Sequence, residues 1–131
     1  MTKKGDPTLA ERIEAVEQAY EVMLAYAAQG REDEGGSIRH FLTRAAAALD
    51  GLSMAATASR QPRDATSREA LAAFLEILDD DARKARVALQ LVLAQKSISS
   101  QLVDNLNASI HLRTLLTDLF LLDEALKISG G

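Results

Sequence analysis

Two histidines, His40 and His111, are the side chains in this sequence with the widest range of possible chemistry. Imidazole titrates near neutral pH, and it serves as a metal ligand or as an acceptor of phosphoryl groups. A helical di-iron site would place a glutamate three residues before each histidine, but the sequence has Ser37 and Ala108 at those positions. We therefore assign no metal ligand and expect no cofactor.

The residues that follow His40 partly resemble the phosphorylated stretch of histidine phosphotransfer domains, which are four-helix bundles. Residues 40–48 read HFLTRAAAA. In that family the histidine is followed by an apolar residue at the second position, lysine at the third and glycine at the fourth. Leu42 matches this pattern, whereas Thr43 and Arg44 replace the lysine and the glycine. The resemblance implies a signalling bundle in which His40 is the phosphoacceptor, and we keep this as one alternative function.

The second histidine lies in a stretch that is similar to the histidine box of sensor kinases. Residues 109–119 read SIHLRTLLTDL, but Ile110 stands where that box has its phosphorylated histidine and His111 where it has glutamate. The alternative is that His111 belongs to a solvated polar stripe, because five polar residues repeat here with helical spacing: Asp104, Asn107, His111, Thr114 and Asp118. The residues that match the kinase box are Leu112, Arg113, Thr114, Leu116 and Thr117.

Acidic pairs on helices suggest a further alternative. Glu11 with Glu14, and Glu76 with Asp79, are spaced by three residues, which places both carboxylates of a pair on one helical face. Such pairs hold divalent metal ions in helical nucleotide pyrophosphohydrolases, so a metal-dependent hydrolase is a second alternative function. Pairs of this kind also occur on any solvated acidic helix. The net charge is −4 and there is no stripe of lysine and arginine, so we expect no nucleic-acid partner.

Composition indicates an all-α protein. Apolar residues make up 47% of the 131 residues and are mostly alanine and leucine, with few aromatic residues and two prolines. The absence of cysteine excludes disulfides, thiolate catalysis and iron–sulfur clusters. Apolar spacing of three and four residues predicts helices at roughly residues 7–29, 37–58, 66–95 and 99–127. We therefore predict one domain over residues 1–131, folded as an antiparallel four-helix bundle.

Capping signals locate the ends of these helices. Thr8 with Glu11, and Thr66 with Glu69, have the spacing of a capping box, and Ser99 or Ser100 is expected to cap the last helix. Ser37 is expected to cap the second helix and Gly30 to end the first one. Residues 31–36, REDEGG, are predicted to form a mobile loop. Gly51 is expected to be a weak point inside the second helix.

The second half of the last predicted helix is apolar on most sides, which predicts an interface between copies of the chain. The interface residues assigned on this basis are Leu115, Leu116, Leu119, Phe120 and Leu122. No uncharged run of 18 residues and no leader pattern occur, so we expect no membrane partner and a cytoplasmic location. The function that the sequence favours is a non-catalytic helical interaction module, such as an adaptor, a chaperone or a regulatory subunit, that self-associates or binds a protein partner.

Overall fold

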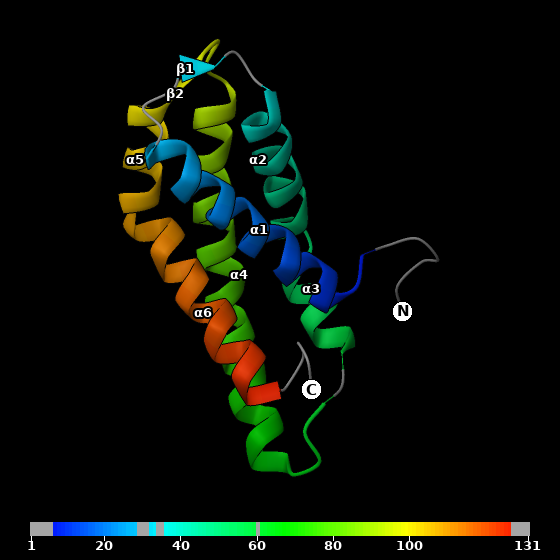
Figure 1. Ribbon diagram of the computed structural model, residues 1–131. Helices are drawn as coiled ribbons and strands as arrows, with labels where there is room; N and C mark the ends of the chain where they lie inside the picture. Colours follow the sequence, from blue (N-terminus) through cyan, green and yellow to red (C-terminus); the bar gives the residue numbers. More distant parts are fainter. Residues whose placement is uncertain (1–6, 29–31, 34–35, 60, 127–131) are drawn as a thin grey trace.

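The computed structural model describes residues 7–28, 32–33, 36–59 and 61–126, and within them the chain is almost entirely helical (Figure 1). The all-α class is thus confirmed. Two very short strands, β1 (Glu32–Asp33) and β2 (Ile98–Ser99), accompany the helices. The helices are α1 (Leu9–Ala28), α2 (Gly36–Leu49), α3 (Leu52–Ala58), α4 (Ala65–Leu93), α5 (Ser100–Ala108) and α6 (Ile110–Leu126).

Local hydrogen bonds fix several helix starts. The Thr8 amide donates to Glu11 Oε1 at 2.9 Å and the Glu11 amide donates to Thr8 Oγ1 at 3.1 Å, which confirms the first capping box. Ser99 caps α5, since its hydroxyl accepts from the Leu102 amide at 3.1 Å. The predicted N-cap of α4, Thr66, is wrong by two residues. Asp64, rather than Thr66, is the N-cap of α4 and accepts from the Ser67 amide at 2.8 Å.

Gly51 divides the second predicted helix into α2 and α3. Its φ of +86° is left-handed, which glycine adopts without the steric cost that a side chain would bring. Arg12 of α1 stabilises the break, because its Nη1 atom donates to the carbonyl oxygens of Ala48 at 3.1 Å and Asp50 at 2.7 Å. These carbonyls have no helical partner at the end of α2. The expectation that Gly51 lies inside one continuous helix is therefore wrong.

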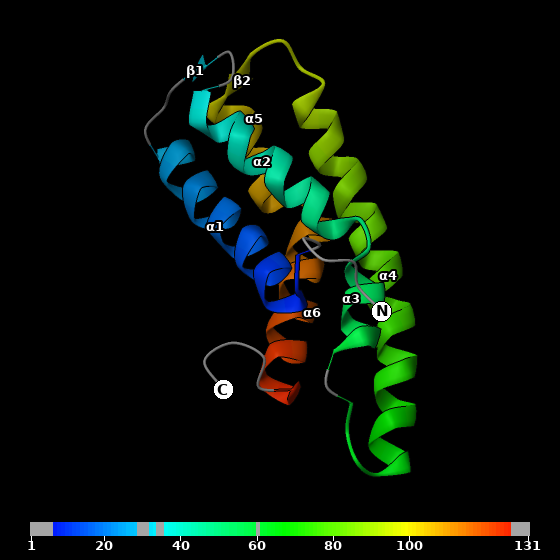
Figure 2. The same cartoon turned by 90° about the vertical axis from the view of Figure 1, so that its right-hand side faces the viewer.

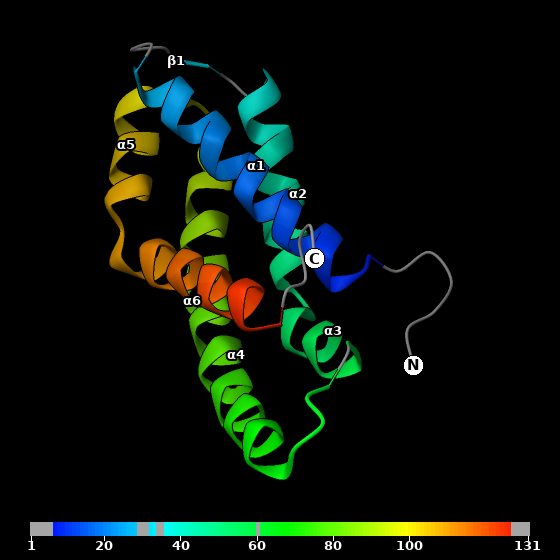
Figure 3. The ribbon, with the colours of Figure 1, turned by 60° about the horizontal axis from the view of Figure 1, so that its bottom comes forward.

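Ser109 divides the last predicted helix into α5 and α6. Its backbone is extended, with φ −61° and ψ 128°, while its carbonyl accepts from the Arg113 amide at 3.1 Å and so starts the next helix at once. Figure 3 shows the change of direction between α5 and α6 at this residue. As a result α5 packs mainly on α1, whereas α6 packs mainly on α4. Because two of the four predicted helices are broken, a regular antiparallel four-helix bundle is not confirmed.

The two strands link the loops at one end of the molecule. They pair antiparallel, with Glu32 opposite Ser99 and Asp33 opposite Ile98. Part of the predicted mobile loop over residues 31–36 is thus a strand, and the rest of that loop before Gly36 lies outside the described residues, as does Gly30. α2 begins at Gly36, one residue before the expected start, and the side chain of Ser37, the predicted cap, lies outside what the structure describes. The hydroxyl of Tyr26 donates to the carbonyl of Ile98 at 2.5 Å, and this hydrogen bond links α1 to β2.

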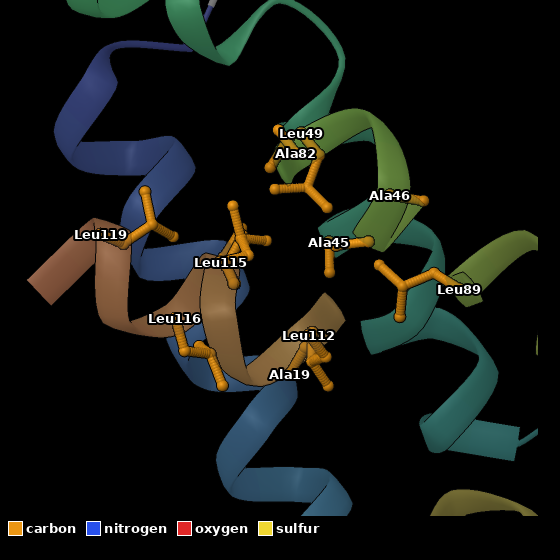
Figure 4. Packing of buried hydrophobic residues seen from close by; sticks show 14 of the residues in the cluster. Ala19, Ala45, Ala46, Leu49, Ala82, Leu89, Leu112, Leu115, Leu116 and Leu119 are labelled. Atoms are coloured by element: carbon orange, nitrogen blue, oxygen red, sulfur yellow. The ribbon is translucent and has the colours of Figure 1, made fainter. Parts of the chain in front are cut away.

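The core contains buried residues from every described helix and Ile98 of β2. Figure 2 shows α1 beside α2, while α4, the longest helix, contacts α2, α3 and α6. Fully buried leucines of α6 supply much of the core, and Figure 4 shows Leu115 and Leu119 on one side of it with Ala45, Leu49 and Leu89 on the other. Alanines of α2 and α4 let the helices approach closely. This packing holds α6 between α1 and α4, so each side of α6 forms a groove with a different neighbour.

Candidate functional site

The structure does not bring the two histidines into a shared site. His40 is exposed on α2, where its ring makes an edge contact with the ring of Phe41, with centroids 5.6 Å apart and planes at 74°. His111 is exposed on the first turn of α6 and lines a hollow of about 190 Å³ with Asp81 and Lys84 of α4. Within the described ranges, no hydrogen bond or ion pair joins either imidazole to another side chain. His40 thus remains accessible, but among the described side chains no acid or base is paired with it to assist its chemistry.

The acidic pairs are placed on separate helices and have other partners. Hydrogen bonds from the backbone and then the side chain of Thr8 lower the pKa of Glu11, because they favour its charged form. Glu14 accepts from Gln18 at 3.3 Å, and Asp79 on α4 accepts from the Ser53 hydroxyl of α3 at 3.0 Å. Across the residues that the structure describes, no three histidine or acidic side chains gather closely enough to hold a metal ion. The second alternative function gains no support from this arrangement.

The five residues assigned to an interface divide into two groups. Phe120 is 51% exposed and is available to a partner. The other four are buried in the core of the single chain with at most 5% of their surface exposed: Leu115, Leu116, Leu119 and Leu122. Their apolar spacing therefore reflects packing against α1 and α4 within one copy. Self-association, and the part that these residues take in it, stay a prediction.

Other large apolar side chains reach the surface instead, and most of them lie on α4 and α6. Leu121 is 58% exposed and Ile77 is 56% exposed. Next to Leu121 the N-terminal part of α4 and the C-terminal part of α6 enclose a groove of about 480 Å³. It is lined mainly by apolar side chains, among them Leu71, Phe74, Leu121, Leu122, Ala125 and Leu126. We call this surface the α4–α6 groove.

A pair of carboxylates sits further along the same two helices. Asp81 of α4 and Asp118 of α6 are both half-buried, and the Oδ2 atom of Asp118 is shielded from solvent without a hydrogen-bond partner among the described residues. Burial, followed by a hydrogen bond and charge repulsion from Asp81, raises the pKa of Asp118 from 3.8 to about 7. When Asp118 is protonated it carries no charge, so the repulsion from Asp81 is removed and the Asp118 hydroxyl can donate to the Asp81 carboxylate.

The spacing of polar residues assigns Asp118 to a solvated stripe and does not distinguish Asp81. The available signal was that both residues adjoin core positions, since Asp81 precedes Ala82 and Asp118 precedes Leu119. Spacing within one helix cannot reveal that the two carboxylates face each other across a helix pair. The α4–α6 groove was also missed, because it is made by two segments about 50 residues apart in sequence.

No protein-family model, no curated protein and no solved structure matches this chain. Within the ranges that the structure describes, no helix is both long and apolar enough to cross a membrane.

Proposed function

We propose that this protein is a non-catalytic helical interaction module, an imperfect antiparallel four-helix bundle that acts in the cytoplasm as a regulatory or adaptor subunit. In this proposal the chain forms a homodimer, and the interface is the α4–α6 groove. This surface is an alternative to the interface leucines that were assigned from the sequence. The observation that carries the proposal is this apolar groove of about 480 Å³ between two helices, with the exposed Leu121 at its edge.

The groove and the side chains beside it have the properties that a two-fold contact needs. A patch that meets its own copy must contain both a hollow and a projection, because the same residues face each other across the axis. Phe74 and Leu71 line the hollow, and Leu121, which also lines it, has 58% of its surface exposed. Insertion of Leu121 from each copy into the groove of the other would remove apolar surface from water, which is favourable by about 25 cal/mol per Å².

Light scattering on the purified chain at tens of micromolar tests the proposal directly. We expect a dimer, and we expect Leu121→Glu to yield monomers with unchanged helix content by circular dichroism, since a charge would be buried without a partner. Leu119→Glu and Leu122→Glu are unsuitable for this purpose, because both side chains lie in the core and their replacement would unfold the chain.

Met54→Glu on α3 is the matched control. Met54 is 76% exposed, so the same change of charge is made at an apolar surface position away from the groove. This variant should remain a dimer. A monomeric wild-type chain would remove the homodimer from the proposal, and equal dissociation of both variants would show that charge rather than the groove controls association. Imaging of a fluorescent fusion tests the proposed cytoplasmic location.

A further inference from the structure

A second hollow lies on the other side of α6, between that helix and α1. It measures about 220 Å³ and is lined by Glu17, Tyr20 and Glu21 of α1 and by Leu116 and Phe120 of α6. Leu116 is buried, Tyr20 is half-buried, and Phe120 is 51% exposed. The chain has two tyrosines and three phenylalanines, and one of each lines this hollow. Exposed aromatic side chains are typical anchors of protein interfaces.

The rim of this hollow is strongly negative. Burial raises the pKa of the Glu17 carboxyl, and repulsion from Asp123, Glu21 and Glu14 raises it further. No lysine or arginine of the described residues forms an ion pair with Glu17 or Glu21. Glu17 is thus repelled by three neighbouring carboxylates, and a positive charge brought beside Glu17 and Glu21 would offset this repulsion.

The size and shape of the hollow indicate what kind of partner fits. Pockets for small molecules usually exceed about 300 Å³, so a hollow of about 220 Å³ fits one or two side chains of a larger partner. Leu24 continues the apolar surface along α1, since it lies one turn after Tyr20 and is 48% exposed. A strip of this kind beside a groove between two helices is suited to the apolar face of a third helix.

We propose that the α1–α6 hollow is the docking site for a cationic amphipathic helix of another protein. An apolar side chain of that helix inserts between Tyr20 and Phe120, while its lysine or arginine side chains reach Glu17 and Glu21. The proposal rests on the proposed function as an interaction module, but it uses a different face from the α4–α6 groove, so the two can fail separately.

A synthetic peptide of about 14 residues, with leucine on one helical face and lysine on the other, serves as the probe in a fluorescence-anisotropy titration of the full chain. We expect saturable binding that weakens at least about fivefold when salt rises from about 50 to 500 mM, because screening reduces attraction between exposed charges. The double variant Glu17→Gln/Glu21→Gln should also bind about fivefold more weakly, as expected for the loss of two exposed ion pairs. Phe120→Ala should weaken binding without altering the net charge.

The matched control is Glu69→Gln/Glu76→Gln, which removes the same charge from exposed positions on α4. This control should bind the peptide as the wild type does. Equal weakening in both double variants would overturn the proposal, since it would show attraction to net charge alone. Equal binding of a peptide with glutamate in place of lysine would also overturn it. Light scattering on the same samples reports self-association independently, so loss of the dimer with retained peptide binding refutes only the proposed homodimer.

Discussion

Replacement of Asp118 by asparagine should stabilise this protein at alkaline pH and leave it unchanged at acidic pH. In the folded chain Asp118 keeps its proton up to about pH 7, because burial and Asp81 disfavour a second negative charge, whereas the unfolded chain releases it near pH 3.8. A carboxyl whose pKa is raised by folding contributes stability below its unfolded value and loses it as the pH rises through the folded value. Wild-type stability should therefore fall between about pH 4 and pH 7 relative to the variant.

The size of this effect follows from the pKa and from solvent exposure. The difference between 3.8 and about 7 sets an upper bound of about 4 kcal/mol, at roughly 1.4 kcal/mol per pH unit. Asp118 is only half-buried, so water screens much of the repulsion from Asp81. We therefore expect the asparagine variant to gain about 1 to 2 kcal/mol over the wild type at pH 8, where its amide can donate to the Asp81 carboxylate.

Urea unfolding followed by circular dichroism, at pH 4.5 and at pH 8, measures the difference. The matched control is Asp104→Asn, which removes one charge from an exposed position on α5 and should change stability little at either pH. A gain for Asp118→Asn that is the same at both pH values would refute the reasoning, because the effect would then not depend on ionisation. A loss of stability at pH 8 would show that the Asp81–Asp118 pair stabilises the contact of α4 with α6.

Four further predictions follow from the helix ends, the core and His40. Asp64→Ala should lower the Tm by about 3 to 5 °C in calorimetry, whereas Thr66→Ala should lower it by less than about 1 °C, because Asp64 is the residue that caps α4. Gly51→Ala should cost about 1 to 2 kcal/mol in urea unfolding, since a side chain strains the left-handed backbone, while the added Cβ would make only ordinary contact with the Arg12 guanidinium, 3.7 Å away at its nearest atom. Leu115→Ala should cost about 2 to 5 kcal/mol in the same measurement, and a loss below about 0.5 kcal/mol would contradict its burial. Incubation with a small phosphodonor should give no acid-labile adduct, whereas a stoichiometric adduct that is lost in His40→Gln would replace the proposed function with phosphotransfer.

Sequence alone determined the helical class, the approximate helical segments and those caps that depend on neighbouring residues. The capping box of Thr8 and Glu11 and the cap at Ser99 form within one turn, so three or four adjacent residues contain the whole interaction. Leu75 and Leu89 recur with helical spacing and both are buried, because a helix must bury one face wherever it packs. These features require no knowledge of which helices become neighbours.

Only the tertiary structure decided where helices break and which side chains meet. Gly51 ends α2 because Arg12, 39 residues earlier in the sequence, reaches the carbonyls at that end of the helix. The bend at Ser109 has no glycine or proline to signal it, and it lets α5 and α6 pack on different helices. Spacing along one helix could not tell core leucines from interface leucines, nor place Asp81 beside Asp118, because burial depends on the distance between segments remote in sequence.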